Sequence, residues 1–194
     1  MHCIDERIKE MELLLDKDIY NKELMESISN KSKEALTILY ENTSSQVYGF
    51  ALSIVKNHHL AEEIMQETYI KIYNSASSYK EEGKLMSWIL TIVKNLSFMQ
   101  LRENKYKINT TDDYINNIQD SHNGFKEKEN KMLLEIVLNI LSDEERQIVI
   151  LYAITGLKHK EISEFLNIPL STILSKYNRA LKKLKKHMEV IIHD

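Results

Sequence analysis

The chain has 194 residues, of which 43% are hydrophobic, and a formal net charge of -3 at pH 7. That apolar content suffices for one ordinary domain or two small ones and argues against global disorder, while four glycines and one proline offer little turn chemistry for an all-β fold. Cys3 is the only cysteine, so an intrachain disulfide is impossible. No signal peptide is visible, and no apolar run reaches the roughly 20 residues of a membrane span. We therefore expect a soluble, cytoplasmic protein without a metal or cofactor.

Apolar residues recur at helical spacing in the first part of the chain, without the alternation of a strand. The spacing predicts an amphipathic helix over residues 4–19, inside an N-terminal extension that we place at 1–28. It then predicts three further helices, over 31–41, 44–57 and 60–75.

A polar stretch containing Gly83 predicts a loop over 75–84, and a long helix follows over 85–105. Residues 29–107 are expected to fold as one compact helical domain. The apolar face of the long helix should consist of Leu85, Trp88, Ile89, Ile92, Leu96 and Met99.

The middle of the chain changes in composition and charge. Residues 108–128 are rich in Asn, Asp, Thr and Ser, which predicts a flexible linker. Residues 109–145 hold nine acidic and three basic side chains, so this part of the chain is acidic. Helix is predicted to resume near Glu129, where a second domain (129–194) begins.

Within that domain, Ser142 and Glu145 have the spacing of a capping box, in which each side chain bonds the backbone of the other. The helix that this box opens is expected to end at Gly156. Lys160 to Leu166 is then predicted to form a short helix, and Asn167 to Pro169 a turn, because Asn tolerates the left-handed conformation and Pro suits a helix start.

This arrangement is typical of a helix-turn-helix. Ser163 is small where the two helices must approach one another. One face of the second helix is expected to be apolar and to pack on the core, and it consists of Ile173, Tyr177, Ala180, Leu181, Leu184 and Met188.

The second helix is strongly cationic in an acidic protein. Six basic residues and no acidic one lie between Ser171 and His187, which favours a localised polyanion, with nucleic acid as the first candidate. A solvated helix face, or a plain helical hairpin with a basic side, is the alternative. If the second helix enters the major groove, its N-terminal part meets base edges and nearby phosphates through Ser171, Thr172, Ser175, Lys176 and Arg179. Residues farther along contact phosphate only: Lys182, Lys183, Lys185 and Lys186.

Both halves together resemble the extracytoplasmic-function (ECF) group of bacterial RNA polymerase sigma factors, over about residues 30–107 and 130–187. Residues 61–69 (AEEIMQETY) resemble one family motif, and a second begins at Trp88-Ile89 and continues through Ile92, Asn95 and Leu101-Arg102. The promoter-reading domain of the family is resembled by Leu141 to Arg146, Gly156-Leu157, Glu161-Ile162, Thr172, Ser175 and Arg179-Ala180. The chain departs from the family pattern at Met99, Lys158, Ser171, Leu174 and Lys176.

The resemblance implies an all-α fold of two small helical domains, sigma region 2 and the helix-turn-helix of sigma region 4, joined by a flexible linker. It implies a non-enzymatic role, in which the chain binds core RNA polymerase and directs it to promoters. Region 4 would read the -35 duplex and rest on the β flap, and the linker would follow the RNA exit path. Core binding to the β′ clamp helices would use Glu62, Glu63, Gln66 and Glu67, although a solvated helix face would look the same.

Region 2 would bind the melted -10 strand, with Tyr79 as an aromatic wall and Asn95 as the amide that reads a base edge. Lys94, Arg102 and Lys105 would hold phosphates. Trp88 could act as a melting wedge, but its spacing favours core packing. An anti-sigma factor is the further partner that the resemblance implies.

The sequence also allows three alternative interpretations. A response-regulator type of helix-turn-helix usually follows an α/β receiver domain, for which the first half shows no strand pattern. A decoy could bind polymerase without promoter activity. An enzyme is disfavoured because the sequence contains no metal-ligand spacing, phosphate-binding glycine loop or nucleophile–base pair.

Overall fold

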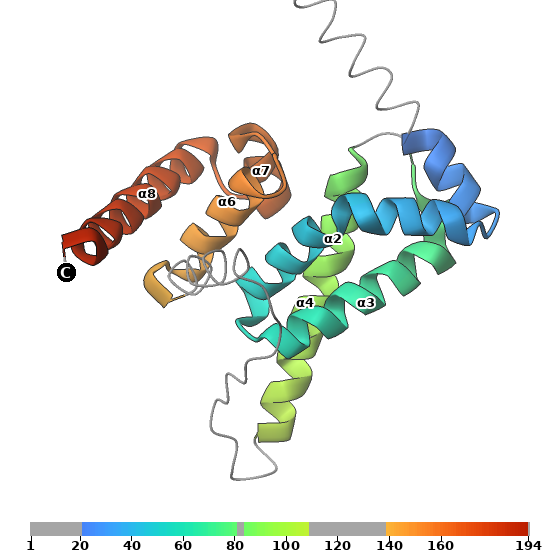
Figure 1. The fold of residues 1–194 in the computed structure, drawn as a ribbon, viewed down its shortest axis with the longest axis horizontal. Helices are drawn as coiled ribbons and strands as arrows, with labels where there is room; N and C mark the ends of the chain where they lie inside the picture. Colours follow the sequence, from blue (N-terminus) through green and yellow to red (C-terminus); the bar gives the residue numbers. More distant parts are fainter. Residues whose placement is uncertain (1–20, 81–83, 109–138, 194) are drawn as a thin grey trace, which may run out of the picture.

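The structure is a computed structural model that describes residues 21–80, 84–108 and 139–193. In these ranges the chain is helical and forms no strand, which confirms the all-α prediction (Figure 1). The helix expected over 4–19 lies outside the described residues. So does the linker expected over 108–128, except for Ile108, which is the last residue of α4 and not linker, and so does the start of the helix expected near Glu129. After helical residues 21–29 the elements are α2 (Lys33–Val55), α3 (His58–Ser75), the short 3-10 helix η1 (Ala76–Ser78), α4 (Leu85–Ile108), α6 (Asp143–Ala153), α7 (His159–Leu166) and α8 (Leu170–His193).

The first body packs α2, α3 and α4 around one apolar core. Side-chain caps define where its helices begin: Ser32 accepts a hydrogen bond from the Ala35 amide at 3.1 Å, and Asn57 accepts one from the Leu60 amide at 2.9 Å. The core between the helices contains the fully buried Phe50, Leu52, Ile72, Ile89, Leu90 and Val93.

The prediction of two helices over 31–41 and 44–57 was wrong, because α2 runs through without a break. The polar residue Thr43 lies at the predicted junction. Its hydroxyl donates to the Leu39 carbonyl at 2.6 Å and lies 2.8 Å from the hydroxyl of Tyr69, so the helix buries it with its hydrogen bonds satisfied.

Helix α4 buries a somewhat different face from the predicted one. Leu85, Ile89 and Leu96 are buried as expected, but Met99 is 38% exposed. Leu90 and Val93 are fully buried instead, since α4 packs against both α2 and α3.

Trp88 is half-buried, and its ring lies edge-on to Tyr79 with 5.4 Å between ring centroids. This contact agrees with the core-packing interpretation of Trp88. The expected loop over 75–84 contains η1, and its residues 81–83 lie outside the described residues.

The second body consists of α6, α7 and α8. The predicted capping box is present, with the Ser142 amide donating to the Glu145 carboxylate at 3.1 Å and the Glu145 amide donating to the Ser142 hydroxyl at 3.4 Å. Helix α6 ends at Ala153, three residues earlier than predicted. Gly156 nevertheless has a φ of 71°, and the left-handed turn lets the Leu157 amide return to the Leu151 carbonyl at 3.2 Å.

The turn between α7 and α8 is as predicted. Asn167 has a φ of 55°, and Ser163 donates to the Ile168 carbonyl at 2.6 Å across the turn. Ile173 and Ala180 are fully buried under α8, but Leu181 is 42% exposed, contrary to the prediction. The side chain of Met188 lies outside the described residues.

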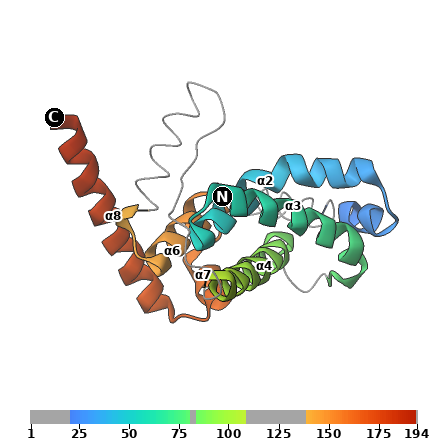
Figure 2. The same cartoon turned by 90° about the horizontal axis from the view of Figure 1, so that it is seen from below.

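The two bodies are in direct contact, with α6 packed on α2 and α7 beside α4 (Figure 2). Glycine in a helix interior costs about 0.5–1 kcal/mol relative to Ala, and Gly49 in α2 shows why it is useful here. A Cβ atom at Gly49 would lie 3.3 Å from the Ile154 Cδ1 atom of the second body. Across the described ranges, none of the helices combines the length and apolar character required of a membrane span.

Candidate nucleic-acid and polymerase interface

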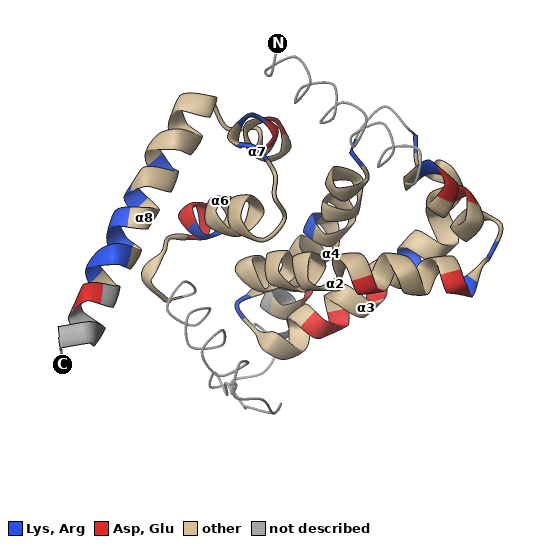
Figure 3. Ribbon diagram, turned by 45° about the horizontal axis from the view of Figure 1, so that its top comes forward, with Lys and Arg blue, Asp and Glu red and all other residues tan. Residues whose placement is uncertain are grey.

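Helix α8 presents a cationic, hydroxyl-rich side to solvent. Figure 3 shows its Lys and Arg residues following one another along the helix. Its first turn is anchored by the Pro169 carbonyl, which accepts from the amides of Thr172 at 2.9 Å and Ile173 at 3.0 Å. With Ile173 and Ala180 buried beneath it, the helix can rotate very little. The residues of the predicted -35 set that it exposes are Ser171, Ser175, Arg179 and Lys182, and Thr172 is half-buried.

Two lysines of the predicted -35 set are instead paired inside the second body. Lys176 forms an ion pair with Glu144, and the Lys183 ammonium lies 2.6 Å from the Glu145 carboxylate. Both acids belong to the first turn of α6. The carboxylate in each pair offsets the charge of the lysine and weakens its attraction for a phosphate. Arg179 and Lys182, which are exposed, are therefore the cations of the predicted set that are most accessible to DNA.

Glu145 is a buried carboxylate, with 3% of its side chain exposed. Burial alone would raise the pKa of Glu145, but the hydrogen bonds from Lys183 and from Ser142 outweigh burial and lower that pKa below its ordinary value. The carboxylate therefore stays ionised near neutral pH and ties α8 to the start of α6.

The predicted core-binding residues Glu62, Glu63, Gln66 and Glu67 are all exposed on one side of α3. They are exposed because the opposite side buries Ala61, Ile64 and Thr68 against the first body's core. Figure 3 shows the acidic residues along α3. Local pairing is weak, since Glu67 lies 3.8 Å from Lys71 and Glu63 lies 3.5 Å from His59, and both pairs are largely exposed.

The residues predicted to bind the -10 strand do not form one cluster. Asn95 and Arg102 are exposed and share an open groove of about 760 Å³ between α3 and α4. Tyr79 lies against Trp88 near the start of α4. The side chain of Lys105 lies outside the described residues. The groove is lined mainly by apolar atoms and is bordered by Lys71, Asn95, Leu96, Phe98, Met99, Leu101 and Arg102.

Lys94 points in a different direction from Asn95, toward the second body. Its ammonium lies 3.5 Å from the Phe165 carbonyl and 5.3 Å from the centre of the Phe165 ring. The sequence gives no sign of this contact, because the two residues are 71 positions apart.

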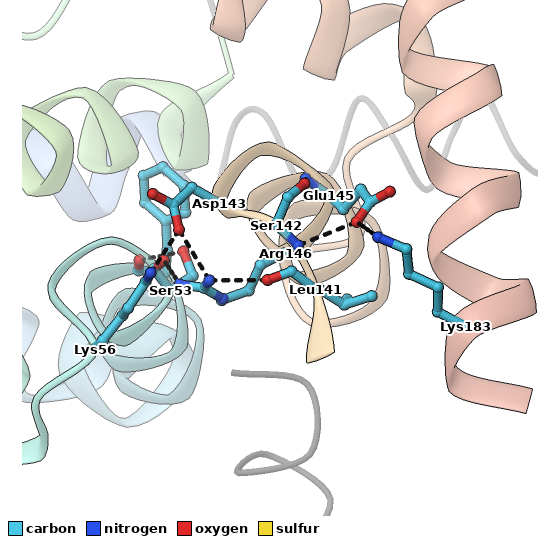
Figure 4. Close-up of polar contacts among 9 residues, drawn as sticks. Ser53, Lys56, Leu141, Ser142, Asp143, Glu145, Arg146 and Lys183 are labelled. Atoms are coloured by element: carbon cyan, nitrogen blue, oxygen red, sulfur yellow. Dashed lines mark hydrogen bonds and ion pairs between the residues drawn. The ribbon is translucent and has the colours of Figure 1, made fainter. Parts of the chain in front are cut away.

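Sequence reasoning also missed the role of Arg146, which is 1% exposed. It donates to the Ser53 carbonyl of α2 and the Leu141 carbonyl, each at 3.1 Å, and to Asp143 at 3.0 Å (Figure 4). The one available signal was a single cation two residues before an apolar run, residues 148–151. Such a residue is rarely buried unless it is paired.

The fold and this surface define a helix-turn-helix protein with a second, all-helical body that carries an acidic helix face. Residues 39–106 match the Sigma-70 region 2 family and residues 137–186 match the Sigma-70, region 4 family. The chain therefore belongs to the sigma-70 family of RNA polymerase sigma factors, in its ECF group.

Curated relatives support this assignment. The ECF RNA polymerase sigma factor SigM of Bacillus subtilis (strain 168) is 30% identical over 149 residues, which cover 76% of this chain and 91% of SigM. The ECF RNA polymerase sigma factor SigK of Mycobacterium sp. (strain KMS) is 27% identical over 171 residues, which cover 84% of this chain and 87% of SigK.

Solved structures show the same fold. The sigma factor RpoE of Bartonella quintana, solved in complex with the anti-sigma factor NepR, aligns with a TM-score of 0.67 at 21% identity, over 79% of this chain and 96% of that one. CnrH, solved in complex with the cytosolic domain of CnrY, aligns with a TM-score of 0.61 at 14% identity, over 86% and 96% of the two chains.

Proposed function

We propose that this sigma factor binds core RNA polymerase and directs it to promoters whose -35 duplex is read by α8 and whose melted -10 strand is read by region 2. The observation that carries the proposal is the occurrence of both sigma regions in one chain. The second helix of the helix-turn-helix buries Ile173 and Ala180 and exposes Arg179 and Lys182. This role is non-catalytic, and it belongs in the cytoplasm, where polymerase acts.

For the -35 element, the proposal assigns base-edge contacts to the exposed N-terminal part of α8. A helix-turn-helix inserts this part of its second helix in the major groove. Ser171, Ser175 and Arg179 are exposed there. Leu174, 42% exposed beside them, offers an apolar contact for a thymine methyl group. Lys182 is proposed to bind phosphate. Thr172, which is half-buried, is proposed to contribute less, and so are Lys176 and Lys183 while they keep their internal ion pairs.

For the -10 element, the proposal assigns the groove of α3 and α4 to a base turned out of the stack. The groove combines apolar walls with one amide, Asn95, and one guanidinium, Arg102. This combination suits a base that needs stacking, an edge contact and a phosphate contact. Tyr79, Lys94 and Lys105 complete the proposed set.

The exposed acidic side of α3 is proposed to dock on the clamp helices of the β′ subunit, because exposed carboxylates suit a basic partner. Region 4 is proposed to rest on the β flap. An anti-sigma factor is a further proposed partner; the solved relatives RpoE and CnrH are each bound to another protein, an anti-sigma factor in the case of RpoE.

Run-off transcription with purified core polymerase, followed by sequencing of transcript 5′ ends, tests the function. We expect Arg179→Ala to weaken binding to the -35 element by about 1–3 kcal/mol, the range of a good base contact. Lys185→Ala removes the same charge farther along α8, and it should weaken all promoters alike. Binding to core without any transcript would identify a decoy, and equal effects of the two substitutions on every promoter would contradict the placement of α8.

A further inference from the structure

We propose that Lys71 is a further ligand of the -10 strand, and that Lys71 and Arg102 hold one phosphate of this strand from the two sides of the groove between α3 and α4. This role rests on the proposed function and adds to it the chemical group that the groove holds. Lys71 belongs to no motif or basic run of the sequence, and only the fold brings it to the groove.

One wall of the groove is an exposed stripe of α4. Four exposed residues lie there at i, i+3, i+4 and i+7, the spacing of one side of a helix: Asn95, Phe98, Met99 and Arg102. Phe98 is 42% exposed and Met99 is 38% exposed, so two large apolar side chains remain in contact with water between an amide and a guanidinium. Exposed apolar side chains that are bordered by polar groups mark a binding surface. This stripe offers apolar contact and stacking to a ligand with a flat face.

Lys71 borders the same groove from the neighbouring helix. Helices α3 and α4 pack against one another (Figure 1), and Lys71 is exposed in the last part of α3. The Lys71 ammonium lies 3.8 Å from the Glu67 carboxylate, and both side chains are about half exposed. An ion pair of this length and exposure contributes little. The ammonium can therefore exchange Glu67 for another anion at small cost.

The charge of the groove favours an anion. Its lining side chains include two cations, Lys71 and Arg102, and no acid, although the whole chain has a net charge of -3. The Arg102 Nε atom donates to the Phe98 carbonyl at 3.2 Å, which holds the guanidinium beside the groove. A phosphate between this guanidinium and the Lys71 ammonium gains charge-assisted hydrogen bonds from both.

A single DNA strand satisfies both parts of the groove. Each nucleotide carries a flat base for the apolar stripe and a phosphate for the two cations. An apolar peptide would cover Phe98 and Met99 but would bring no anion to Lys71 and Arg102. The combination of apolar and cationic side chains therefore favours the strand over a peptide as the occupant.

The salt dependence of strand binding tests the role of Lys71. Holoenzyme assembled from core polymerase and the full chain is titrated with a fluorescent single-stranded oligonucleotide that carries the non-template -10 sequence, as mapped from transcript 5′ ends. Each phosphate contact to a single strand contributes about -0.7 to the slope of log K against log salt. Lys71→Gln should make the slope shallower by about 0.7, so its deficit in affinity should shrink about fourfold between about 50 and 400 mM KCl.

Two further variants control for charge and for a shared phosphate. Lys185→Gln removes the same charge from α8 of region 4, and it should leave the slope unchanged because the oligonucleotide carries no -35 element. Lys71→Gln combined with Arg102→Gln should lose less affinity than the product of the two single losses, because both cations hold one phosphate. A loss equal to that product would place the cations on separate phosphates and overturn the shared site.

The outcomes separate this role from the proposed function. An unchanged slope and affinity for Lys71→Gln would overturn the phosphate contact and leave the groove to a protein partner. Absence of transcripts with the parent chain would refute the proposed function instead. Oligodeoxythymidylate of about 12 residues then still tests the groove with the full chain alone, and equal salt slopes for the parent and Lys71→Gln would overturn the contact.

Discussion

Replacement of Arg146 should destabilise region 4 strongly, although no DNA or polymerase contact is assigned to this residue. Arg146→Ala removes three hydrogen bonds from a guanidinium that is 1% exposed. It leaves the carbonyls of Ser53 and Leu141 without this donor. Asp143 is less affected, because it keeps Lys56 at 2.7 Å and is largely exposed.

The magnitude follows from the two carbonyls. A buried polar group that loses its partner costs about 1–3 kcal/mol, so two of them cost about 2–6 kcal/mol. Removal of one partner from a buried ionic network costs about 3–5 kcal/mol in other proteins, which agrees with the sum. We therefore expect Arg146→Ala to lower the free energy of unfolding by about 3–5 kcal/mol. Arg146→Lys should cost less, because it keeps the charge but loses the planar fork of donors.

Urea unfolding with two probes measures this effect. Far-ultraviolet circular dichroism follows all helices, whereas fluorescence follows the single tryptophan, Trp88, in α4 of region 2. With a urea dependence of about 2 kcal/mol per molar, the midpoint seen by circular dichroism should fall by about 1.5–2.5 M. The fluorescence midpoint should fall less, because most of the core around Trp88 is untouched.

Arg102→Ala is the matched control. Arg102 is exposed and donates within α4 to the Phe98 carbonyl at 3.2 Å, so its loss should change stability by no more than about 0.5 kcal/mol. A loss below about 1 kcal/mol for Arg146→Ala would refute the reasoning, since the two carbonyls would then have found other partners at no cost.

Three further predictions concern local interactions. Ser142→Ala should cost about 1 kcal/mol in urea unfolding by removing the capping box, whereas Ser45→Ala on the exposed side of α2 should not destabilise. The hydrogen bond from Lys56 lowers the pKa of Asp143 below its ordinary value of 3.8. The contribution of ionised Asp143 to folding stability is therefore complete above pH 3.8 and is lost as pH falls through the lower native pKa. Lys56→Met should flatten this acid dependence of the urea midpoint. Burial raises the pKa of Tyr69 to about 12, so the contribution of neutral Tyr69 to folding stability should be intact below pH 10 and fall between pH 10 and 12. Ultraviolet difference absorbance follows the ionisation of the tyrosines, and ionisation of every tyrosine near pH 10 in the folded chain would contradict this prediction.

Local features were predictable because their causes lie within a few residues. The capping box of Ser142 and Glu145 and the left-handed turn at Asn167 each depend on side chains next to the backbone groups that they satisfy. The exposure of the α3 acids followed from helical periodicity. The errors arose where a neighbour remote in sequence decides. Thr43 stays helical with its hydroxyl 2.8 Å from that of Tyr69, and among the residues that the structure describes no helix buries Met99 or Leu181.

The sequence by itself determined the helical class, the helix-turn-helix and the sigma-70 family, since hydrophobic periodicity and short motifs are written in neighbouring residues. The extent of the two domains at 29–107 and 129–194 stays a prediction. Only the tertiary structure decided where the long cationic side chains go. Lys183 reaches Glu145 across 38 positions, Lys94 reaches Phe165 across 71, and Arg146 reaches Ser53 across 93. A flexible side chain takes whichever anion or carbonyl the fold brings within 3–4 Å, and that choice depends on packing between helices that are remote in sequence.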